Sequence, residues 1–273
     1  MKNNNILPRA KKRFGQNFLV DENVLQEIIA AAEIKPTDTV LEIGAGTGIL
    51  TAELAQRAAR VITVEIDRDL AANLPKFKNV ELVEGDFLKE TENIFAKVSG
   101  KIKVIANIPY YITTPILEKL LECRAHIETV TLMVQKEVAD RICAEPCGKE
   151  YGSLSIFLKY YADVYFVCLV PPQAFRPRPQ VDSAVVRLDM RAELKYRPLS
   201  EKRFFNIVRG AFWGRRKTLR NTLKQSPYTH YTNAVLEKMA QETGLDLNRR
   251  GETLGIEEFV TLSNVEIKNQ SNF

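Results

Sequence analysis

Short apolar segments of strand character alternate with segments of helical spacing through the first half of the chain. Helical spacing is found over residues 21–32, 50–59 and 136–144. The apolar segments predict strands over residues 39–43, 61–64, 80–83, 102–106 and 129–134. This alternation predicts a mostly parallel sheet covered by helices on both faces. Ligands of such sheets bind beyond the carboxyl ends of the strands, so the residues that end each strand should gather on one rim.

The second half of the chain follows a different pattern. After an expected helix at 153–162, strands at 164–170 and 184–188 flank a proline-rich loop, which suggests an antiparallel hairpin that closes the sheet. Expected helices then follow over residues 201–212, 217–224, 232–242 and 256–264. We therefore predict an α/β domain over residues 1–192, with seven strands, and a small all-α domain over residues 193–273.

Three glycines follow the first predicted strand at every second position: Gly44, Gly46 and Gly48. A dinucleotide-binding loop would need its third glycine at Ile49, and no lysine with serine or threonine follows as in a P-loop. Glu65 ends the next strand, where a carboxylate can accept hydrogen bonds from a ribose diol. The pattern favours a nucleoside without a pyrophosphate. The alternative is a tight turn beside a buried acid.

Asp86 ends the third predicted strand. Its carboxylate could accept a hydrogen bond from the amino group of an adenine. By itself, however, the residue is more typical of a turn.

The tetrapeptide Asn107-Ile108-Pro109-Tyr110 follows the fourth predicted strand. The Asn107 side-chain oxygen and the Ile108 carbonyl could accept hydrogen bonds from an amine on a base, which makes its nitrogen a better nucleophile. Pro109 would stiffen the loop, and Tyr110 offers a ring on which a base can stack. The alternative is a proline turn beside a core tyrosine. The position of the tetrapeptide on the same rim of the sheet as the glycine loop favours the functional interpretation.

Basic residues are clustered in a chain with a formal net charge of +5. An expected flexible lead-in over the first 20 residues contains no acid and five bases, namely Lys2, Arg9, Lys11, Lys12 and Arg13. A second cluster has only Glu201 beside it and comprises Lys202, Arg203, Arg209, Arg215, Arg216, Lys217, Arg220 and Lys224. Such clusters are typical of phosphate-binding surfaces. A single cluster, taken alone, favours the solvated face of a helix.

The cysteines, the N-terminal sequence and the apolar runs bear on three expectations: metal binding, cellular compartment and membrane association. Cys143 and Cys147 have no second pair of ligands, so we expect no metal site. We expect reduced thiols in a cytoplasmic protein. We also expect no membrane association, because there is no secretory signal and no apolar run of spanning length.

Taken in order, these motifs resemble those of the bacterial small-subunit ribosomal RNA adenine dimethyltransferases. Residues 14–19 are similar to the opening motif of that family, residues 41–48 to its cofactor loop and residues 107–115 to its catalytic loop. Further similar segments lie at 133–137, 171–183, 215–219 and 250–254. The resemblance spans nearly the whole chain. Ala45 and Gln180 depart from it, since we expect proline and lysine there.

The resemblance implies a Rossmann-like class I methyltransferase fold that uses S-adenosyl-L-methionine. It implies dimethylation of N6 of two adjacent adenosines in the 3′-terminal hairpin of 16S rRNA, within an immature 30S particle, as a step of ribosome biogenesis, by a protein that we expect to be monomeric. The implied cofactor residues are Gln16, Asn17, Leu19, Gly44, Gly46, Glu65, Ile66, Asp86, Phe87 and Asn107. The implied catalytic residues are Asn107, Ile108, Pro109, Tyr110 and Phe175, of which Tyr110 and Phe175 would enclose the target adenine. The expected RNA-binding residues are Arg13, Arg215, Arg216, Lys217 and Arg220.

Three alternatives remain open from the sequence. The nearest is a large-subunit (23S) rRNA adenine methyltransferase of the antibiotic-resistance type, although Tyr111, residues 113–115 and the basic helical tail favour the small-subunit enzyme. A DNA adenine methyltransferase more often has Pro-Pro in the catalytic tetrapeptide. A non-catalytic assembly factor would not need the glycine loop, Glu65 and Asn107 together.

Overall fold

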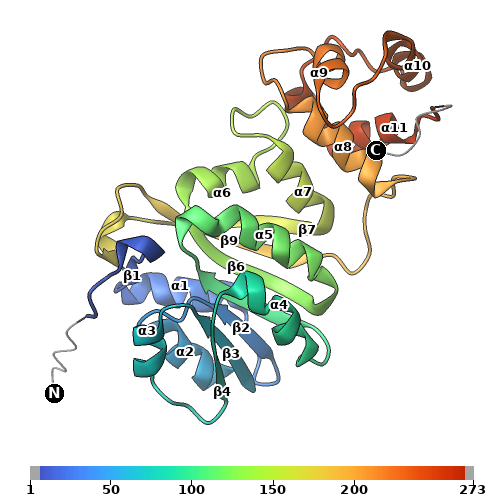
Figure 1. Cartoon of the computed structure of the whole chain (residues 1–273). Coiled ribbons are helices and arrows are strands. Elements are labelled where there is room, and N and C mark those ends of the chain that lie inside the picture. The colour runs from blue at the N-terminus through green and yellow to red at the C-terminus, as the bar shows by residue number, and fades with distance from the viewer. Residues whose placement is uncertain (1–6, 268–273) are drawn as a thin grey trace. The chain divides into compact units, whose positions relative to one another are not determined.

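The computed structural model describes residues 7–267 (Figure 1). Expectations for residues 1–6 and 268–273, including the one for Lys2, lie outside the described residues. The described chain divides into two compact units. The first unit comprises the chain up to residue 139 together with residues 163–190, and the second comprises residues 140–162 and the chain from residue 191 onward.

A seven-stranded sheet forms the centre of the first unit. Its strands are β2 (Thr39–Ile43), β3 (Arg60–Glu65), β4 (Val80–Glu84), β5 (Ile102–Asn107), β6 (Ile127–Gln135), β7 (Ala162–Val170) and β9 (Ser183–Met190). They lie in the order β4-β3-β2-β5-β6-β9-β7. Strands β2 to β6 pair in parallel, whereas β9 pairs antiparallel to β6. The predicted mostly parallel sheet with a late hairpin is confirmed.

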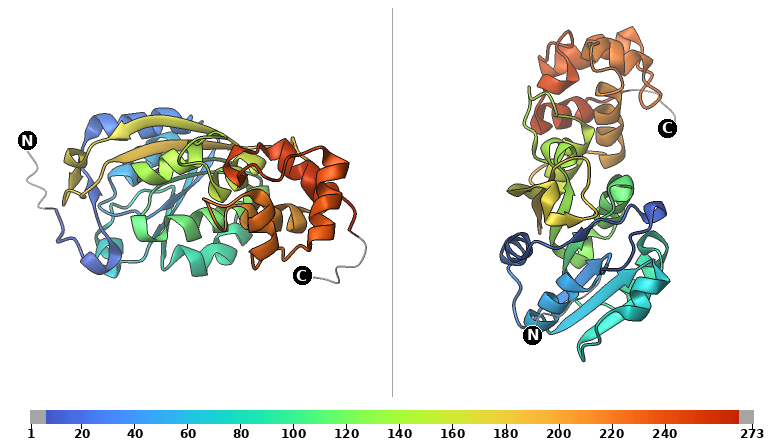
Figure 2. Two further views of the ribbon diagram at one scale, coloured as in Figure 1. Left: turned by 90° about the horizontal axis from the view of Figure 1, so that it is seen from above. Right: turned by 90° about the vertical axis from the view of Figure 1, so that its left-hand side faces the viewer.

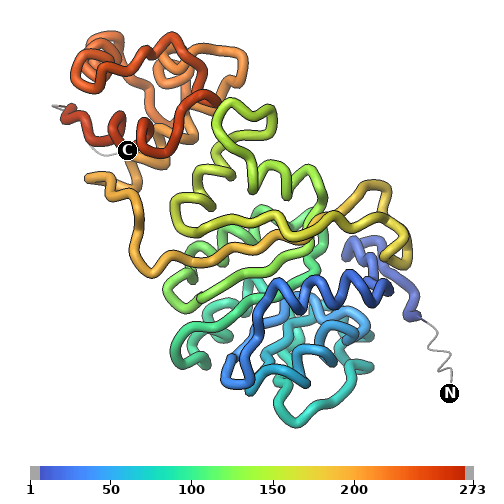
Figure 3. Tube along the Cα trace, turned by 180° about the vertical axis from the view of Figure 1, so that it is seen from behind, coloured from blue at the N-terminus to red at the C-terminus, as the bar shows by residue number. Residues whose placement is uncertain are grey.

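Helices cover both faces of this sheet (Figure 2). Figure 1 shows α4 (Phe87–Ala96) and α5 (Thr113–Glu122) in front of the strands, and Figure 3, seen from behind, shows α1 (Glu22–Ala32) in front of them. Helix α2 (Ile49–Arg57) contacts α1, and the short helix α3 (Arg68–Asn73) contacts β3. The sheet is therefore buried between two layers, which explains why its central strands are almost continuously apolar.

The core between α1 and the sheet follows from the apolar face of α1. Asp21 begins the helix by accepting hydrogen bonds from the backbone of Asn23 and Val24. The buried residues Leu25 and Ile28 then lie four and seven residues after Asp21, on the face that packs in a core with Leu54 of α2. This packing fixes the strand ends that carry the site.

A second, two-stranded sheet ties the N-terminal segment to the body of the first unit. Strand β1 (Phe18–Leu19) pairs antiparallel with β8 (Phe175–Arg176). The side chain of Lys11 also bonds to Asp67, at 2.5 Å between Nζ and Oδ1. The expectation of a flexible lead-in is therefore wrong for residues 11–19, because long-range contacts that leave no local sequence pattern hold this segment.

The second unit is mainly helical, and it includes residues 140–162, which we expected in the α/β domain, besides the region after residue 191. It contains α7 (Ser153–Tyr161), α8 (Glu201–Ala211), α9 (Leu219–Gln225), α10 (Asn233–Thr243) and α11 (Ile256–Asn264), while α6 (Lys136–Cys143) crosses the boundary between the units. Its core includes the fully buried rings of Phe204, Tyr160 and Phe259. Short 3-10 helices in the chain are η1 (Lys12–Phe14), η2 (Tyr110–Ile112), η3 (Arg124–His126), η4 (Pro172–Ala174) and η5 (Gly251–Thr253). Among the described residues, no helix has both the length and the apolar character needed to span a bilayer.

Candidate active site

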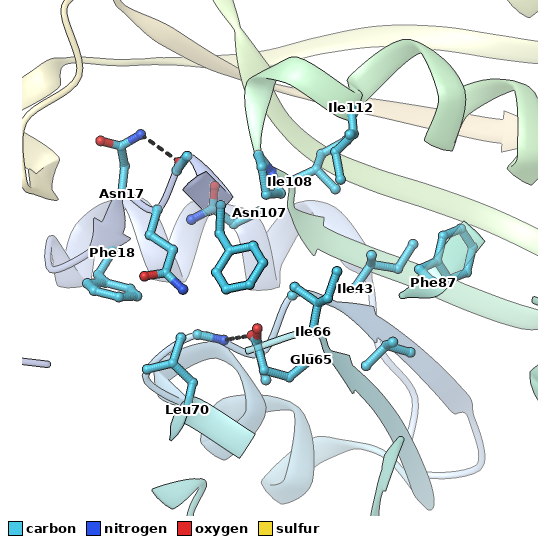
Figure 4. A pocket seen from close by; sticks show the side chains of 18 of the residues that line it. Asn17, Phe18, Ile43, Glu65, Ile66, Leu70, Phe87, Asn107, Ile108 and Ile112 are labelled. Atoms are coloured by element: carbon cyan, nitrogen blue, oxygen red, sulfur yellow. Dashed lines mark hydrogen bonds between the residues drawn. The ribbon is translucent and has the colours of Figure 1, made fainter. Parts of the chain in front are cut away.

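A cavity of about 250 Å³ opens at the carboxyl ends of β2, β3, β4 and β5 (Figure 4). This is the rim on which the strand-end residues were expected to gather, because parallel strands end on the same side. The cavity brings together most of the predicted residues, namely Gln16, Asn17, Leu19, Gly44, Gly46, Glu65, Ile66, Asp86, Phe87, Asn107, Ile108, Pro109 and Tyr110. They come from five segments between residues 16 and 110, and all of them belong to the first unit.

The glycine loop adopts a backbone conformation that glycine favours. The φ angles of Gly44, Gly46 and Gly48 are 82°, 58° and 81°, all in the left-handed region. A Cβ on Gly48 would lie 2.8 Å from the side chain of Pro75, so that position also lacks space. Ala45, where the resemblance predicts proline, donates its backbone N–H to the carbonyl of Val64 at 3.3 Å. A proline could not make this hydrogen bond.

Glu65 is held rigidly at the end of β3. Its Oε2 accepts a hydrogen bond from the backbone N–H of Gly46, and its Oε1 accepts one from that of Asp67, both at 2.8 Å. The first of these bonds is drawn in Figure 4. Burial raises the pKa of the Glu65 carboxyl, and the backbone N–H groups partly oppose this effect. Each oxygen keeps a lone pair, so the carboxylate can accept two hydroxyl groups of a ribose.

Apolar and acidic side chains line the cavity together with Glu65, and a purine base attached to a bound ribose could contact them. Ile66 exposes 44% of its surface at the cavity, whereas Phe87 is buried in the cavity lining. Asp86 caps α4, because one carboxylate oxygen accepts a hydrogen bond from Leu88 N at 3.1 Å. Its turn role is therefore real, and the second oxygen of the same carboxylate is available to a ligand.

The Asn107-Ile108-Pro109-Tyr110 loop leaves β5 and enters η2 and then α5. Its bend is fixed by the carbonyl of Pro109, which accepts from Ile112 N at 3.2 Å, and by that of Tyr110, which accepts from Thr113 Oγ1 at 3.2 Å. The Asn107 carbonyl would lie 3.5 Å from a Cβ added to Gly44, so the two loops pack directly on each other. Asn107 and Glu65 thus line the same cavity from two different strands (Figure 4).

The structure adds Ser183 to this loop, a residue that ends the similar segment 171–183 but for which the sequence predicted no role. The hydroxyl groups of Tyr110 and Ser183 lie 2.6 Å apart. Ser183 is fully buried at the start of β9, and burial also raises the pKa of Tyr110. The 73 residues between the two partners explain why no local motif could indicate the pair.

The N-terminal segment forms one wall of the cavity and is anchored by charge. Gln16 accepts a hydrogen bond from the backbone of Lys11 at 2.7 Å and donates one to Asp67 at 2.8 Å. Lys11 in turn bonds to Asp67 and to Asp69, each at 2.5 Å. Although burial alone would raise it, the pKa of Asp67 is lowered by the hydrogen bonds from Lys11 and Gln16. Lys11 was expected only as part of a phosphate-binding cluster, and Asp67 was not predicted, because both roles depend on contacts that this fold creates.

Phe175 does not line the cavity. Its ring is fully buried in the hydrophobic core, and its backbone pairs with Leu19 in the β1–β8 sheet. The structure therefore separates Phe175 from the other predicted catalytic residues. Its expected contact with a target base stays a prediction.

The predicted RNA-binding residues are in both units. Arg13 is exposed in the first unit, with its guanidinium 4.7 Å from the ring centroid of Phe14. In the second unit, Arg215 and Arg216 are exposed in the turn between α8 and α9. Lys217 donates to Gln225 at 2.6 Å, and Arg220 pairs with Glu237 at 2.7 Å. Arg220 is thus already neutralised in part, whereas Arg216 is exposed.

The cysteines are free thiols. Burial raises the pKa of Cys123, Cys143 and Cys168, so these groups stay protonated at neutral pH. They offer no thiolate for nucleophilic chemistry.

Both the sequence and the fold of the chain are similar to those of known proteins. The family model described as "Ribosomal RNA adenine dimethylase" matches residues 8–267. A protein of Clostridium botulinum (strain Loch Maree / Type A3) named "Ribosomal RNA small subunit methyltransferase A" is 47% identical over 92% of both chains. Its namesake from Lachnoclostridium phytofermentans is 44% identical over 93% of this chain and 91% of its own.

Two solved structures are similar over nearly the whole chain. A dimethyladenosine transferase from Plasmodium falciparum has a TM-score of 0.76 at 30% identity and covers 90% of this chain and 95% of its own. The 23S rRNA methyltransferase ErmE has a TM-score of 0.68 at 30% identity, over 90% and 98% of the two chains. With a family model that matches almost all of its length, this chain belongs to the ribosomal RNA adenine dimethylase family.

Proposed function

We propose that this chain transfers two methyl groups to N6 of each of two adjacent adenosines in the 3′-terminal hairpin of small-subunit rRNA. As a member of its family it is an rRNA adenine dimethyltransferase that uses S-adenosyl-L-methionine. Relatives named for the small subunit support that substrate over the large-subunit rRNA. The observation that carries the proposal is the single cavity shared by Glu65 and the Asn107 loop.

The residues of the cavity fit the methyl donor. Glu65, fixed by two backbone N–H groups, would accept the ribose hydroxyls, and Ile66 with Phe87 would contact the adenine ring. Asp86 would accept from the adenine amino group with its second oxygen. Gly44 and Gly46 would let the backbone approach the ligand, and Gln16, Asn17 and Leu19 would cover it from the N-terminal side. When bound, the donor supplies an electrophilic methyl group on a sulfonium.

Asn107 and its loop would prepare the target amine. The lone pair of adenine N6 is delocalised into the ring, which makes the amine a weak nucleophile. The Asn107 side-chain oxygen and the Ile108 carbonyl would accept its two N–H hydrogens and so localise electron density on nitrogen as the new N–C bond forms. Pro109 fixes these acceptors in place before the substrate arrives. For each methyl group that it gains, the nitrogen releases one proton to solvent.

Tyr110 would hold the base against these acceptors. Its ring lines the cavity, and the hydrogen bond to Ser183 fixes the hydroxyl end. Stacking of a base on such a ring contributes about 1–3 kcal/mol. Phe175 would form the second wall only after its ring leaves the core, so we propose that base entry is coupled to a movement of β8.

The rRNA would be held by basic residues outside the cavity. We propose residues 1–192 as the catalytic part and residues 193–273 as the RNA-binding part, with Arg215, Arg216, Lys217 and Arg220 on phosphates and Arg13 beside the cavity. The target would be an immature 30S particle, bound by a monomer. Light scattering of the purified protein tests the monomeric state.

The reaction is tested with labelled methyl donor and unmethylated small subunits, followed by mapping of the modified nucleotides. We expect two adjacent dimethylated adenosines and no label on large subunits. Asn107→Ala should lose the label while it keeps most of its binding to the small-subunit RNA. Label on large-subunit rRNA would instead identify the resistance-type activity, and unchanged turnover of Asn107→Ala would refute the role of Asn107.

The RNA-binding role of the second unit is tested separately. Arg216→Ala should weaken small-subunit binding and reduce the slope of log affinity against log salt by about 1, because one phosphate contact is lost. Lys195→Ala, an exposed lysine of the same unit that lies near Glu257, is the matched control. An equal loss in both variants would show that net charge alone, and not this turn, binds the RNA.

A further inference from the structure

An exposed aromatic cluster lies beside the basic turn of the second unit. It consists of Phe157 from α7, Arg209 from α8, Trp213 just after α8 and Tyr228 after α9, and we call it the Trp213 cluster. Trp213 exposes 57% of its surface and Tyr228 exposes 39%. Trp213 is the one tryptophan of the chain. Two exposed rings side by side form a surface on which a flat ligand can stack.

The rings and the guanidinium of the cluster are held in fixed relative positions. The Trp213 and Tyr228 ring centroids are 6.1 Å apart with the rings at 78°, so Tyr228 meets Trp213 in an edge contact. Arg209 lies 5.1 Å from the ring centroid of Phe157 and 6.0 Å from that of Tyr228. These contacts leave part of the indole exposed to solvent.

The backbone around the cluster explains why it is rigid. The Thr229 side chain would lie 3.1 Å from a Cβ added to Gly210, a tight distance, so the glycine favours close packing of the segment after α9 on α8. Thr229 Oγ1 donates to the carbonyl of Leu223 at 2.6 Å, and Tyr228 N donates to Ser226 Oγ at 3.0 Å. Tyr228 is thereby fixed against the end of α8.

The charge around the cluster is strongly positive. Arg215 and Arg216 follow Trp213 after one glycine, and both are exposed. Lys217 bonds to the neutral Gln225 rather than to an acid. Between residues 202 and 232 the sequence has eight lysines and arginines and no aspartate or glutamate. A polyanion with flat apolar groups matches both properties of this surface.

We infer that the Trp213 cluster binds an unpaired nucleotide of the rRNA, with the base stacked on the indole and the adjoining phosphates on Arg215 and Arg216. Base pairs in a helix present edges and backbone, whereas an unpaired base presents a face that an aromatic ring can cover. This inference rests on the proposed function, because it takes RNA as the substrate. The site would be distinct from the cavity that binds the target adenine, since it lies in the other unit.

The single tryptophan makes the cluster directly observable. The probe is a short single-stranded oligoadenylate, titrated into the full chain while tryptophan fluorescence is recorded. We expect saturable quenching, and weaker quenching by a duplex of the same length. Trp213→Ala should lower the affinity for labelled oligoadenylate at least about fivefold, as loss of one stacked base predicts, and Trp213→Phe should restore part of it. Because indole is uncharged, Trp213→Ala should leave the salt slope unchanged, unlike Arg216→Ala.

Tyr165→Ala is the matched control, because Tyr165 exposes 51% of its surface on β7 in the first unit. The inference is overturned if Trp213→Ala binds oligoadenylate as tightly as the unaltered chain, or if Tyr165→Ala loses as much affinity. Quenching by a ribosomal protein but not by RNA would also overturn it in favour of a protein partner. Methylation of small subunits is measured in parallel. Intact methylation without oligoadenylate binding refutes this inference alone, and oligoadenylate binding without methylation refutes the proposed function alone.

Discussion

The Nζ atom of Lys11 lies 2.5 Å from Oδ1 of Asp67. Asp67 follows Glu65, the acid that faces the cavity, by two residues. Asp67 also accepts from Gln16, and its backbone N–H donates to Glu65. One carboxylate thus connects the N-terminal wall of the cavity to the acid expected to bind ribose. The wall and the acid should therefore respond together when this contact is removed.

We predict that Lys11→Ala weakens binding of the methyl donor several-fold, because the wall formed by residues 14–19 loses its anchor. The change should be seen in the dissociation constant by calorimetry, and also as faster proteolysis near the N-terminus in the absence of cofactor. Lys12→Ala, an exposed neighbour, is the control. If both variants bind the cofactor equally well, the Lys11–Asp67 contact plays no part in closing the site.

Binding of the methyl donor should weaken as the pH falls, and should begin to do so at a higher pH than an ordinary glutamate would allow. Burial raises the pKa of Glu65, and only the ionised carboxylate accepts from both ribose hydroxyls. The affinity is therefore complete above this pKa and is lost as the pH falls through it. Calorimetry across a pH series measures the effect.

Glu65→Gln should bind weakly with a flatter pH profile. Glu84→Gln is the matched control, because Glu84 is the register partner of Glu65 on β4 and is half exposed. A pH profile of Glu65→Gln that parallels the unaltered chain would assign the titration to another group.

A second buried acid should lower stability at high pH. Glu42 on β2 is fully buried, and its Oε2 accepts from Thr51 at 2.6 Å and Thr63 at 2.7 Å, while Oε1 has no partner among the described residues. Burial raises the pKa of Glu42 from 4.5 to about 7. The folded chain therefore holds a proton that the unfolded chain has lost between these values, and stability falls as the pH rises through that window.

We predict that Glu42→Gln removes most of this fall, which corresponds to about 3 kcal/mol at full ionisation. The glutamine oxygen can still accept from Thr51 and Thr63. Denaturant unfolding at about pH 5 and about pH 8.5 measures the difference, with the exposed Glu128→Gln as control. An unchanged pH dependence in Glu42→Gln would mean that this carboxyl is ionised at little cost.

The sequence predicted the sheet well because its strands are short and buried on both faces. The predicted limits of β2 are identical to the observed ones, and those of β5 differ by one residue. Helices α3, α4 and α5 were not predicted. Helix α3 has only six residues, α4 has a polar middle, and α5 starts within the loop motif and contains Pro115.

The site was predictable where local motifs carry it and not where distant segments meet. Gly44, Glu65 and Asn107 end strands, so topology alone places them on one rim. The two-residue strand β1 depends on β8, more than 150 residues away, and no periodicity can be detected in two residues. The same argument applies to Lys11–Asp67 and to Tyr110–Ser183.

The hydroxyl of Ser183 should act as a positioning group for Tyr110. Ser183→Ala removes the hydrogen bond that fixes the ring, and a typical bond of this kind contributes about 0.5–1.5 kcal/mol, so kcat for methylation should fall about 3- to 10-fold. Cofactor affinity should not change, because Ser183 does not line the cavity. Tyr110→Phe removes the other hydroxyl and should have a similar effect. The double variant should be no slower than either single one, since both remove the same bond. Ser155→Ala, an equally buried serine of the second unit, is the control, and multiplicative effects in the double variant would show that the two hydroxyls act independently.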